Sequence, residues 1–242
     1  MATLEPAEYL EAIGTESGKL RRAAARAGLD ARVPSCPDWD VAALLAHMGR
    51  VYRWASACVE ANELVSPSSL PEPPGRDELD AWVRDGADHV RAVLDRPADD
   101  PTWTWVPPAR VGFWQRRQAH ETAVHRVDAE LAGGEPTPIS GELAADGIDE
   151  WLTLLPHRRG APPVTGHGET LHLHCTDRPG EWLVRLTEDG PEVERAHAKG
   201  DVAVRGPASD LLLVFLRRLA PERVEVLGQR PVLDDFLAQT GF

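Results

Sequence analysis

Apolar residues in the first part of the chain recur at helical spacing. In four stretches they return every three or four residues, which places them on one face of a helix. These stretches predict helices at residues 6–27, 39–64, 78–94 and 112–132. Asp38 and Asp77 precede the second and third helices and are expected to cap them. Helices of this length with proline-bearing connections favour an antiparallel four-helix bundle.

The pattern changes after the segment EPTPIS, which we expect to link two domains. A fifth helix is predicted at residues 141–155. From Thr170 onward, apolar and polar residues alternate, which predicts strands at TLHLHCT, EWLVRLTEDG, EVERAHA and DVAVRG. A helix at ASDLLLVFLRRLA, a strand at RVEVLG and a closing helix at VLDDFLAQTGF follow. The fold class is therefore α+β, with a helical bundle at residues 1–138 and an α+β domain at residues 139–242.

Composition narrows the classes of partner. The chain has 242 residues and a formal net charge of −13 at pH 7, which disfavours nucleic acid or an anionic membrane surface as a partner. Its three widely spaced cysteines form neither a disulfide framework nor a CxxC motif, which fits a reducing compartment. No signal peptide or membrane-spanning stretch is apparent. We expect a cytoplasmic protein, monomeric or homodimeric, that acts on small molecules.

Three residues suggest a metal site. Glu121 and His125 lie four residues apart, on one face of the fourth predicted helix. His47 lies within the second. A single histidine in a helix is more often a core or surface residue than a ligand, but the Glu121 and His125 spacing strengthens the metal interpretation. Two imidazoles and one carboxylate leave a fourth position open on zinc, as catalytic sites do. Such an ion can hold a thiol as its thiolate, because coordination lowers the thiol's proton affinity.

Other polar residues near these allow more than one interpretation. Asp128 could accept a hydrogen bond from the ring of a liganding histidine, or form a surface ion pair with Arg117 or Arg126. His120 turns away from His125 on the helix and is expected to support the site from outside or to face solvent.

Two further histidines lie on one face of the first predicted strand. His172 and His174 alternate with leucines there, and could bind a metal or simply form a solvated polar face. We favour the solvated face. Cys175 points to the opposite face and is expected in the core.

Two motifs resemble those of a known family. The stretch VPSCPDWDVAALLAHMGRVYRWA has the form P-x-W-x-V-x-x-L-x-x-H, ending at His47, and HETAVHRVDAEL has the form E-x-x-x-H-x-x-D. Both resemble the mycothiol-dependent maleylpyruvate isomerase family, whose N-terminal half is similar to DinB-like metal-binding four-helix bundles. The stretches GDVAVRGPASDLLLVFLRRL and RVEVLGQRPVLDDFL resemble the family's small C-terminal α+β domain, which is sterol-carrier-like.

The resemblance implies a site, cofactors and a reaction. His47, Glu121 and His125 would hold a divalent metal, usually zinc, and the thiol would be mycothiol in an actinobacterial source. The reaction would be isomerisation of a maleylpyruvate-type acid, or transfer of the thiol to an electrophile. For isomerisation, the thiolate would add to a cis double bond, the new single bond would rotate, and the thiolate would leave. Candidates to bind the substrate's carboxylate are Arg50, Arg53, Arg110, Arg116, Arg117, Arg205, Arg217 and Arg218.

Two other functions fit the same residues. The bundle could be a non-catalytic metal-binding or regulatory scaffold. It could also be a metal-dependent hydrolase with water in the open position, served by Asp128 or His120 as general base. In the thiol-dependent interpretation, none of Cys36, Cys58 and Cys175 is the nucleophile. Trp39, Trp54 and Trp114 could line a cleft or form the bundle core.

Overall fold

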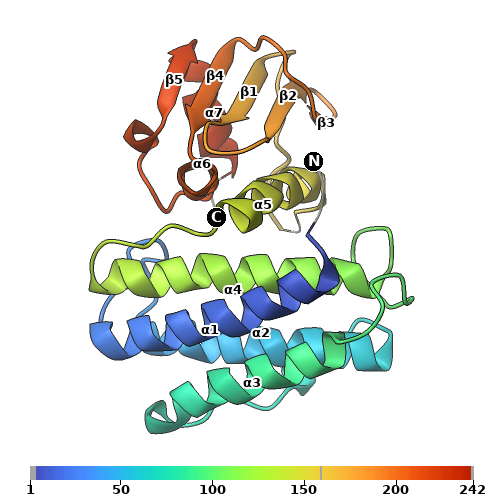
Figure 1. Ribbon diagram of the computed structural model, residues 1–242, viewed down its shortest axis with the longest axis vertical. Helices are drawn as coiled ribbons and strands as arrows, with labels where there is room; N and C mark the ends of the chain where they lie inside the picture. The colour runs from blue at the N-terminus through green and yellow to red at the C-terminus, as the bar shows by residue number, and fades with distance from the viewer. Residues whose placement is uncertain (1–3, 159, 241–242) are drawn as a thin grey trace. The chain divides into compact units, whose positions relative to one another are not determined.

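The computed structural model describes residues 4–158 and 160–240 and confirms the α+β class (Figure 1). The chain divides into two compact units, a helical unit at Leu4–Thr137 and an α+β unit that begins at Pro138. Within the described residues, none of the helices is both long and apolar enough to cross a membrane.

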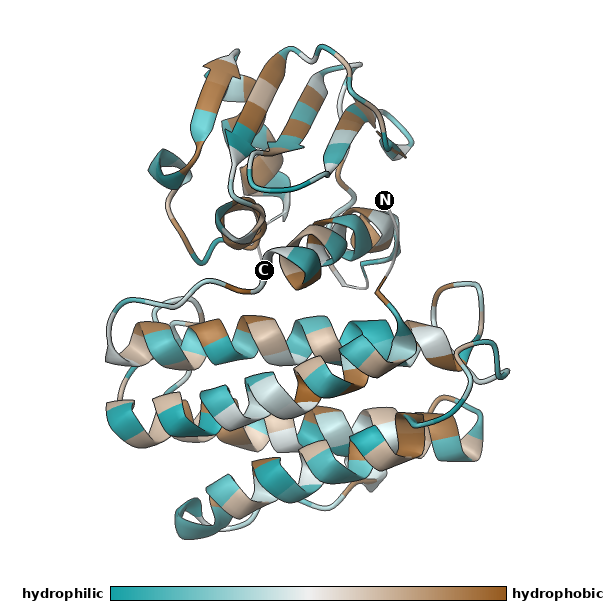
Figure 2. Ribbon diagram, viewed as in Figure 1, coloured by the Kyte–Doolittle hydropathy of each residue, from teal (hydrophilic) through white to brown (hydrophobic). Residues whose placement is uncertain are grey.

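The helical unit is built from four helices: α1 (Pro6–Ala27), α2 (Val41–Ala61), α3 (Leu79–Leu94) and α4 (Val111–Gly133). Helix α1 packs against α4 and α3, and α2 packs against α3 and α4. Figure 2 shows hydrophobic and hydrophilic residues interspersed along each of these helices. The predicted four-helix arrangement is thereby confirmed, and α2 and α4, which carry the candidate metal ligands, are direct neighbours.

The predicted caps of two helices are wrong. Asp40, not Asp38, caps α2, because its Oδ1 accepts a hydrogen bond from the backbone N of Ala43 at 2.8 Å. The backbone N of Val33 donates to the carbonyl of Trp39 at 3.1 Å, which keeps the chain folded back on itself until Asp40. Asp77 lies inside a short 3-10 turn, Arg76–Glu78, that precedes α3, and no side chain caps that helix.

The α+β unit contains a five-stranded sheet in the order β3-β2-β1-β4-β5. Strands β1 and β4 pair in parallel, and the other neighbours pair antiparallel. Helices α6 and α7 pack against β1 and β4. The elements of this unit are α5 (Gly141–Leu154), β1 (Thr170–Cys175), β2 (Glu181–Thr187), β3 (Gly190–Glu194), β4 (Val202–Gly206), α6 (Ala208–Phe215), β5 (Glu225–Gly228) and α7 (Arg230–Thr240).

Several elements of this unit are shorter than predicted, and the structure shows the reason for two of them. Strand β3 ends at Glu194, because the next residue, Arg195, turns away to form a two-pronged ion pair with Asp149 of α5 at 2.5 and 2.8 Å. Helix α6 ends at Phe215, because Arg217 adopts a left-handed conformation with φ of 63°. The backbone N of Arg218 then bonds back to the carbonyl of Leu213, as at many helix C-termini.

Candidate metal centre

The structure brings the three predicted ligands together in the helical unit. His47 comes from α2, and Glu121 and His125 come from α4. Oε1 of Glu121 lies 3.6 Å from Nε2 of His47 and 3.2 Å from Nε2 of His125. One ligand atom from each residue lies within 4.8 Å of the others. Ligands bonded tetrahedrally to zinc at about 2.0–2.1 Å lie about 3.4 Å apart, so this spacing suits a single ion.

Asp128 holds the ring of His125 from behind. Its Oδ2 lies 2.8 Å from Nδ1 of His125, and its Oδ1 accepts a hydrogen bond from the hydroxyl of Ser35 at 2.5 Å. Since Asp128 is fully buried, the alternative of a surface ion pair is wrong. The bond directs Nε2 of the ring toward Glu121, which is how a carboxylate orients a metal-binding histidine.

The charges favour an ionised carboxylate at the centre. Burial raises the pKa of Glu121, but Arg117, His125 and His47 lower it by more, so that it lies well below its usual range. Arg117 donates to Oε2 of Glu121 at 2.5 Å, which leaves Oε1 facing the two imidazoles. Burial lowers the pKa of His125, whereas its bonds to Asp128 and Glu121 raise it, with a net value of about 9.

Of the three tryptophans proposed to line a cleft, only Trp39 contacts the candidate ligands. Its ring centroid lies 4.7 Å from that of His47 and 6.1 Å from that of His125. Trp114 is fully buried and packs against Trp54 with centroids 5.4 Å apart, inside a separate aromatic cluster. Trp39 therefore covers the two imidazoles, and Trp114 belongs to the core.

His120 and the cysteines are not members of this group of candidate ligands among the described residues. His120 is buried, with its ring edge against Tyr9 at a centroid distance of 6.2 Å, so the expectation that it faces solvent is wrong. Cys58 and Cys175 are buried and Cys36 is partly exposed. Among the described residues, no cysteine belongs to a group able to hold a metal ion.

Arg117 pairs with a candidate ligand, Glu121. Arg53 instead lies 3.3 Å over the ring of Trp82, and Arg50 pairs with Glu72. The others with described contacts bind elsewhere: Arg110 with Asp99, Arg205 with Glu225, Arg217 with the carbonyl of Leu237, and Arg218 with the carbonyl of Leu216.

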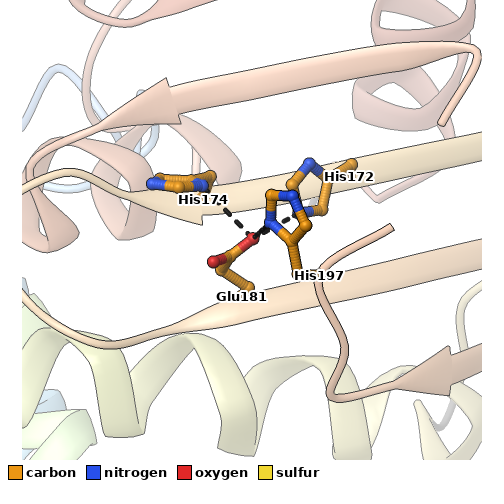
Figure 3. Close-up of side chains that lie close together, drawn as sticks. All are labelled: His172, His174, Glu181 and His197. Carbon is orange, nitrogen blue, oxygen red and sulfur yellow. Dashed lines mark hydrogen bonds and ion pairs between the residues drawn. The ribbon is translucent and has the colours of Figure 1, made fainter. Parts of the chain in front are cut away.

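The α+β unit contains a second group of potential ligands, His172, His174, Glu181 and His197 (Figure 3). The alternating pattern in the sequence indicates only the two histidines of β1 and favours a solvated face for them. His172 is in fact buried. Glu181 and His197 were not predicted, although a carboxylate at the start of the next strand was a signal that could have identified Glu181.

Comparisons with known proteins agree with the fold. Residues 10–130 match the family model described as the mycothiol maleylpyruvate isomerase N-terminal domain, and residues 142–235 match the MDMPI C-terminal domain. The crystal structure of a mycothiol-dependent maleylpyruvate isomerase is 12% identical, with a TM-score of 0.64 over 93% of this chain and 95% of that one. A mutant of that isomerase, with alanine in place of one histidine, is 13% identical with the same TM-score and coverage. At this identity the two structures show a shared fold.

Among curated proteins, none matches this sequence significantly. The two family models nevertheless account for both units of the chain and support an enzyme of the isomerase type. The chain belongs to the mycothiol-dependent maleylpyruvate isomerase family.

Proposed function

We propose that this protein isomerises a maleylpyruvate-type acid with mycothiol as its thiol cofactor, at a divalent metal held by His47, Glu121 and His125. The observation that carries the proposal is the convergence of these three side chains in a chain of this family. Transfer of the thiol to another electrophile would use the same site.

The residues fit a divalent ion. Imidazole nitrogens and carboxylate oxygens are both ligands that zinc accepts, and three protein ligands leave a position for an external thiol. A bound ion would lower the pKa of such a thiol, so that it reacts as the thiolate near neutral pH. The ion is expected to be zinc.

The surrounding residues prepare this site. Asp128 and Ser35 fix the ring of His125, so that one nitrogen stays directed at the site. Arg117 keeps Glu121 ionised and places a positive charge beside the ligands, suited to a substrate carboxylate or to the oxygen that gains negative charge. Trp39 packs its ring against the two imidazoles.

The reaction requires a double bond to become single for a moment. A thiolate that adds to the alkene carbon β to a carbonyl moves the π electron pair toward the carbonyl oxygen and leaves a single bond that can rotate. Return of the electron pair then expels the same thiolate and restores the double bond in the trans form. The thiol and its proton are both recovered, so the product is an isomer of the substrate with no atoms gained or lost. The non-catalytic scaffold and the hydrolase remain the alternatives. The scaffold would form no product, and the hydrolase would form a hydrolysed one.

The test follows maleylpyruvate by proton NMR, in which cis and trans vinyl protons have different coupling constants. The zinc-loaded protein with mycothiol should form the trans isomer, and omission of the thiol or the His125→Ala change should reduce the rate at least about 100-fold. His89→Ala, an exposed position on α3, is the control and should retain the rate. An equal rate without thiol, a hydrolysed product, or no turnover by the metal-loaded protein would contradict the proposal.

A further inference from the structure

The second group of ligands lies where two strands and a crossing segment of the α+β unit meet. His172 and His174 are two residues apart on β1, so both side chains point to one face of the sheet. Glu181 of β2 is the direct cross-strand partner of His174 and shares that face. His197 comes from the segment that follows β3, and its ring turns toward the same carboxylate (Figure 3).

Three imidazoles converge on one carboxylate oxygen. Oε2 of Glu181 lies 2.9 Å from Nε2 of His172, 3.2 Å from Nδ1 of His174 and 2.5 Å from Nδ1 of His197. A carboxylate has about four lone-pair sites on its two oxygens, so one oxygen accepts about two hydrogen bonds. Hydrogen bonding to Glu181 therefore does not account for all three rings, whereas a cation among them would be bonded by every one.

We propose that His172, His174, Glu181 and His197 form a second, independent metal site that binds a divalent transition-metal ion such as zinc. Their ligand atoms lie within 4.8 Å of one another, a range that includes the separation of about 3.4 Å expected around tetrahedral zinc. Imidazole and carboxylate donors suit zinc, copper and nickel better than magnesium or calcium, which prefer all-oxygen sites. Four protein ligands would close the coordination sphere, so the site is structural rather than catalytic.

The segment that carries His197 is anchored at both ends without the metal. Before it, Arg195 forms the two-pronged ion pair with Asp149. After it, Asp201 accepts hydrogen bonds from the backbone N and the hydroxyl of Thr170 at 2.8 and 2.7 Å. These contacts hold the segment beside β1. Binding an ion therefore costs little conformational entropy of the chain.

Gly200 allows this segment to run close to the sheet. A Cβ added at this position would lie 2.9 Å from the backbone N of His172, a contact that side chains do not tolerate. The close approach brings His197, three residues earlier, within reach of the histidines on β1. A bound ion would then fasten the segment to β1 and β2 through three separate parts of the chain.

The positive charge on the neighbouring strand is paired with a carboxylate. Arg205 of β4 is the register partner of His174 and is the cation of the neighbouring strand on this face. Its guanidinium is paired with Glu225 at 3.0 Å, which balances its charge. The ligand set itself carries one negative charge when the imidazoles are neutral, as they must be to bind a metal.

The test isolates this site by removing the other. Full-length His125→Ala protein, with His47→Ala as a second background in case the first misfolds, is titrated with zinc against a competing chelator, and bound zinc is measured by elemental analysis. We expect one zinc ion per chain. Adding H174A and H197A together should weaken its binding by at least about 100-fold, since loss even of an outer partner of a ligand costs 10–100-fold. Adding H167A instead, at an exposed histidine of the same unit, should leave it unchanged.

A second readout separates binding from misfolding. Zinc should raise the unfolding temperature of the His125→Ala protein, and this rise should vanish when H174A and H197A are added, with the circular dichroism spectrum retained. The proposal is overturned if the His125→Ala and His47→Ala proteins bind no zinc, or if zinc binds equally well after H174A and H197A. Neither result bears on the bundle site, which those backgrounds lack.

Discussion

Oδ2 of Asp128 lies 2.8 Å from Nδ1 of His125. Asp128 is fully buried, and this contact directs the other ring nitrogen of His125 toward Glu121. Asp128 thus acts on the candidate metal centre through His125 without being one of its ligands. The same carboxylate accepts the Ser35 hydroxyl, so its own position is fixed from the loop that precedes α2.

Asp128→Asn should weaken zinc binding at the bundle site by about 10–100-fold, because the amide holds the ring of His125 less firmly. Chelator competition in the H174A/H197A background measures this site alone. Asp88→Asn, an exposed acid on α3, is the matched control. Unchanged zinc affinity in Asp128→Asn would show that Asp128 has only a packing role.

Zinc binding at this site should strengthen as pH rises. In the metal-free protein the pKa of His125 is raised from 6.5 to about 9, despite the opposing effect of burial. The folded protein therefore holds a proton on His125 at neutral pH. The contribution of this protonated ring to the stability of the fold is fully present below pH 6.5 and is lost as the pH rises through 9. Metal must displace that proton, so the apparent affinity should increase about tenfold per pH unit between pH 7 and 8. Calorimetry in buffers of different ionisation heat should show about one proton released, and the same affinity at both pH values would contradict this.

A buried ion network should dominate the stability of the helical unit. Arg126 of α4 is fully buried and pairs with Glu16 of α1 and Glu130 of α4, each at 2.7 Å. Arg126→Ala would leave two buried carboxylates without this partner, which should lower the free energy of unfolding by about 3–5 kcal/mol. Urea denaturation measures the change. Arg84→Ala, at an exposed pair on α3, should change it by less than about 0.5 kcal/mol, and similar losses in both variants would refute the network's importance.

The buried cysteines should be unreactive in the folded protein. Burial and the nearby Asp177 raise the pKa of Cys175 to about 12, and burial raises that of Cys58. Iodoacetamide at pH 8 should label Cys36 first, and Cys58 and Cys175 only after denaturation, as read by mass spectrometry. Replacement of all three by serine should preserve thiol-dependent turnover, and loss of turnover with metal still bound would identify a protein thiolate as the nucleophile.

Local signals in the sequence predicted the positions of the helices more accurately than the residues that cap them. Helix α1 begins at Pro6 and ends before Gly28, whose φ of 85° suits glycine, and both residues are visible in the sequence. Asp38 and Asp40 are equally good caps by type. The choice between them depends on backbone bonds in the preceding loop, which local patterns do not reveal.

The two ligand groups differ in how far the sequence reveals them. Glu121 and His125 share a helix face at i, i+4, so their proximity follows from the helix alone. His47 joins them through the packing of α2 on α4, for which the family motif was the clue. His197 lies in an irregular segment positioned by the Arg195–Asp149 and Thr170–Asp201 contacts, so no periodic pattern could place it beside β1.

The most direct test of the thiol-binding metal is X-ray absorption at the zinc edge. Zinc-loaded H174A/H197A protein, which retains the bundle site, is measured before and after mycothiol is added. We predict only nitrogen and oxygen neighbours at about 2.0–2.2 Å before addition, and one new sulfur neighbour at about 2.3 Å after it. An unchanged spectrum at saturating mycothiol, with zinc still bound, would contradict thiol activation by the metal at His47, Glu121 and His125.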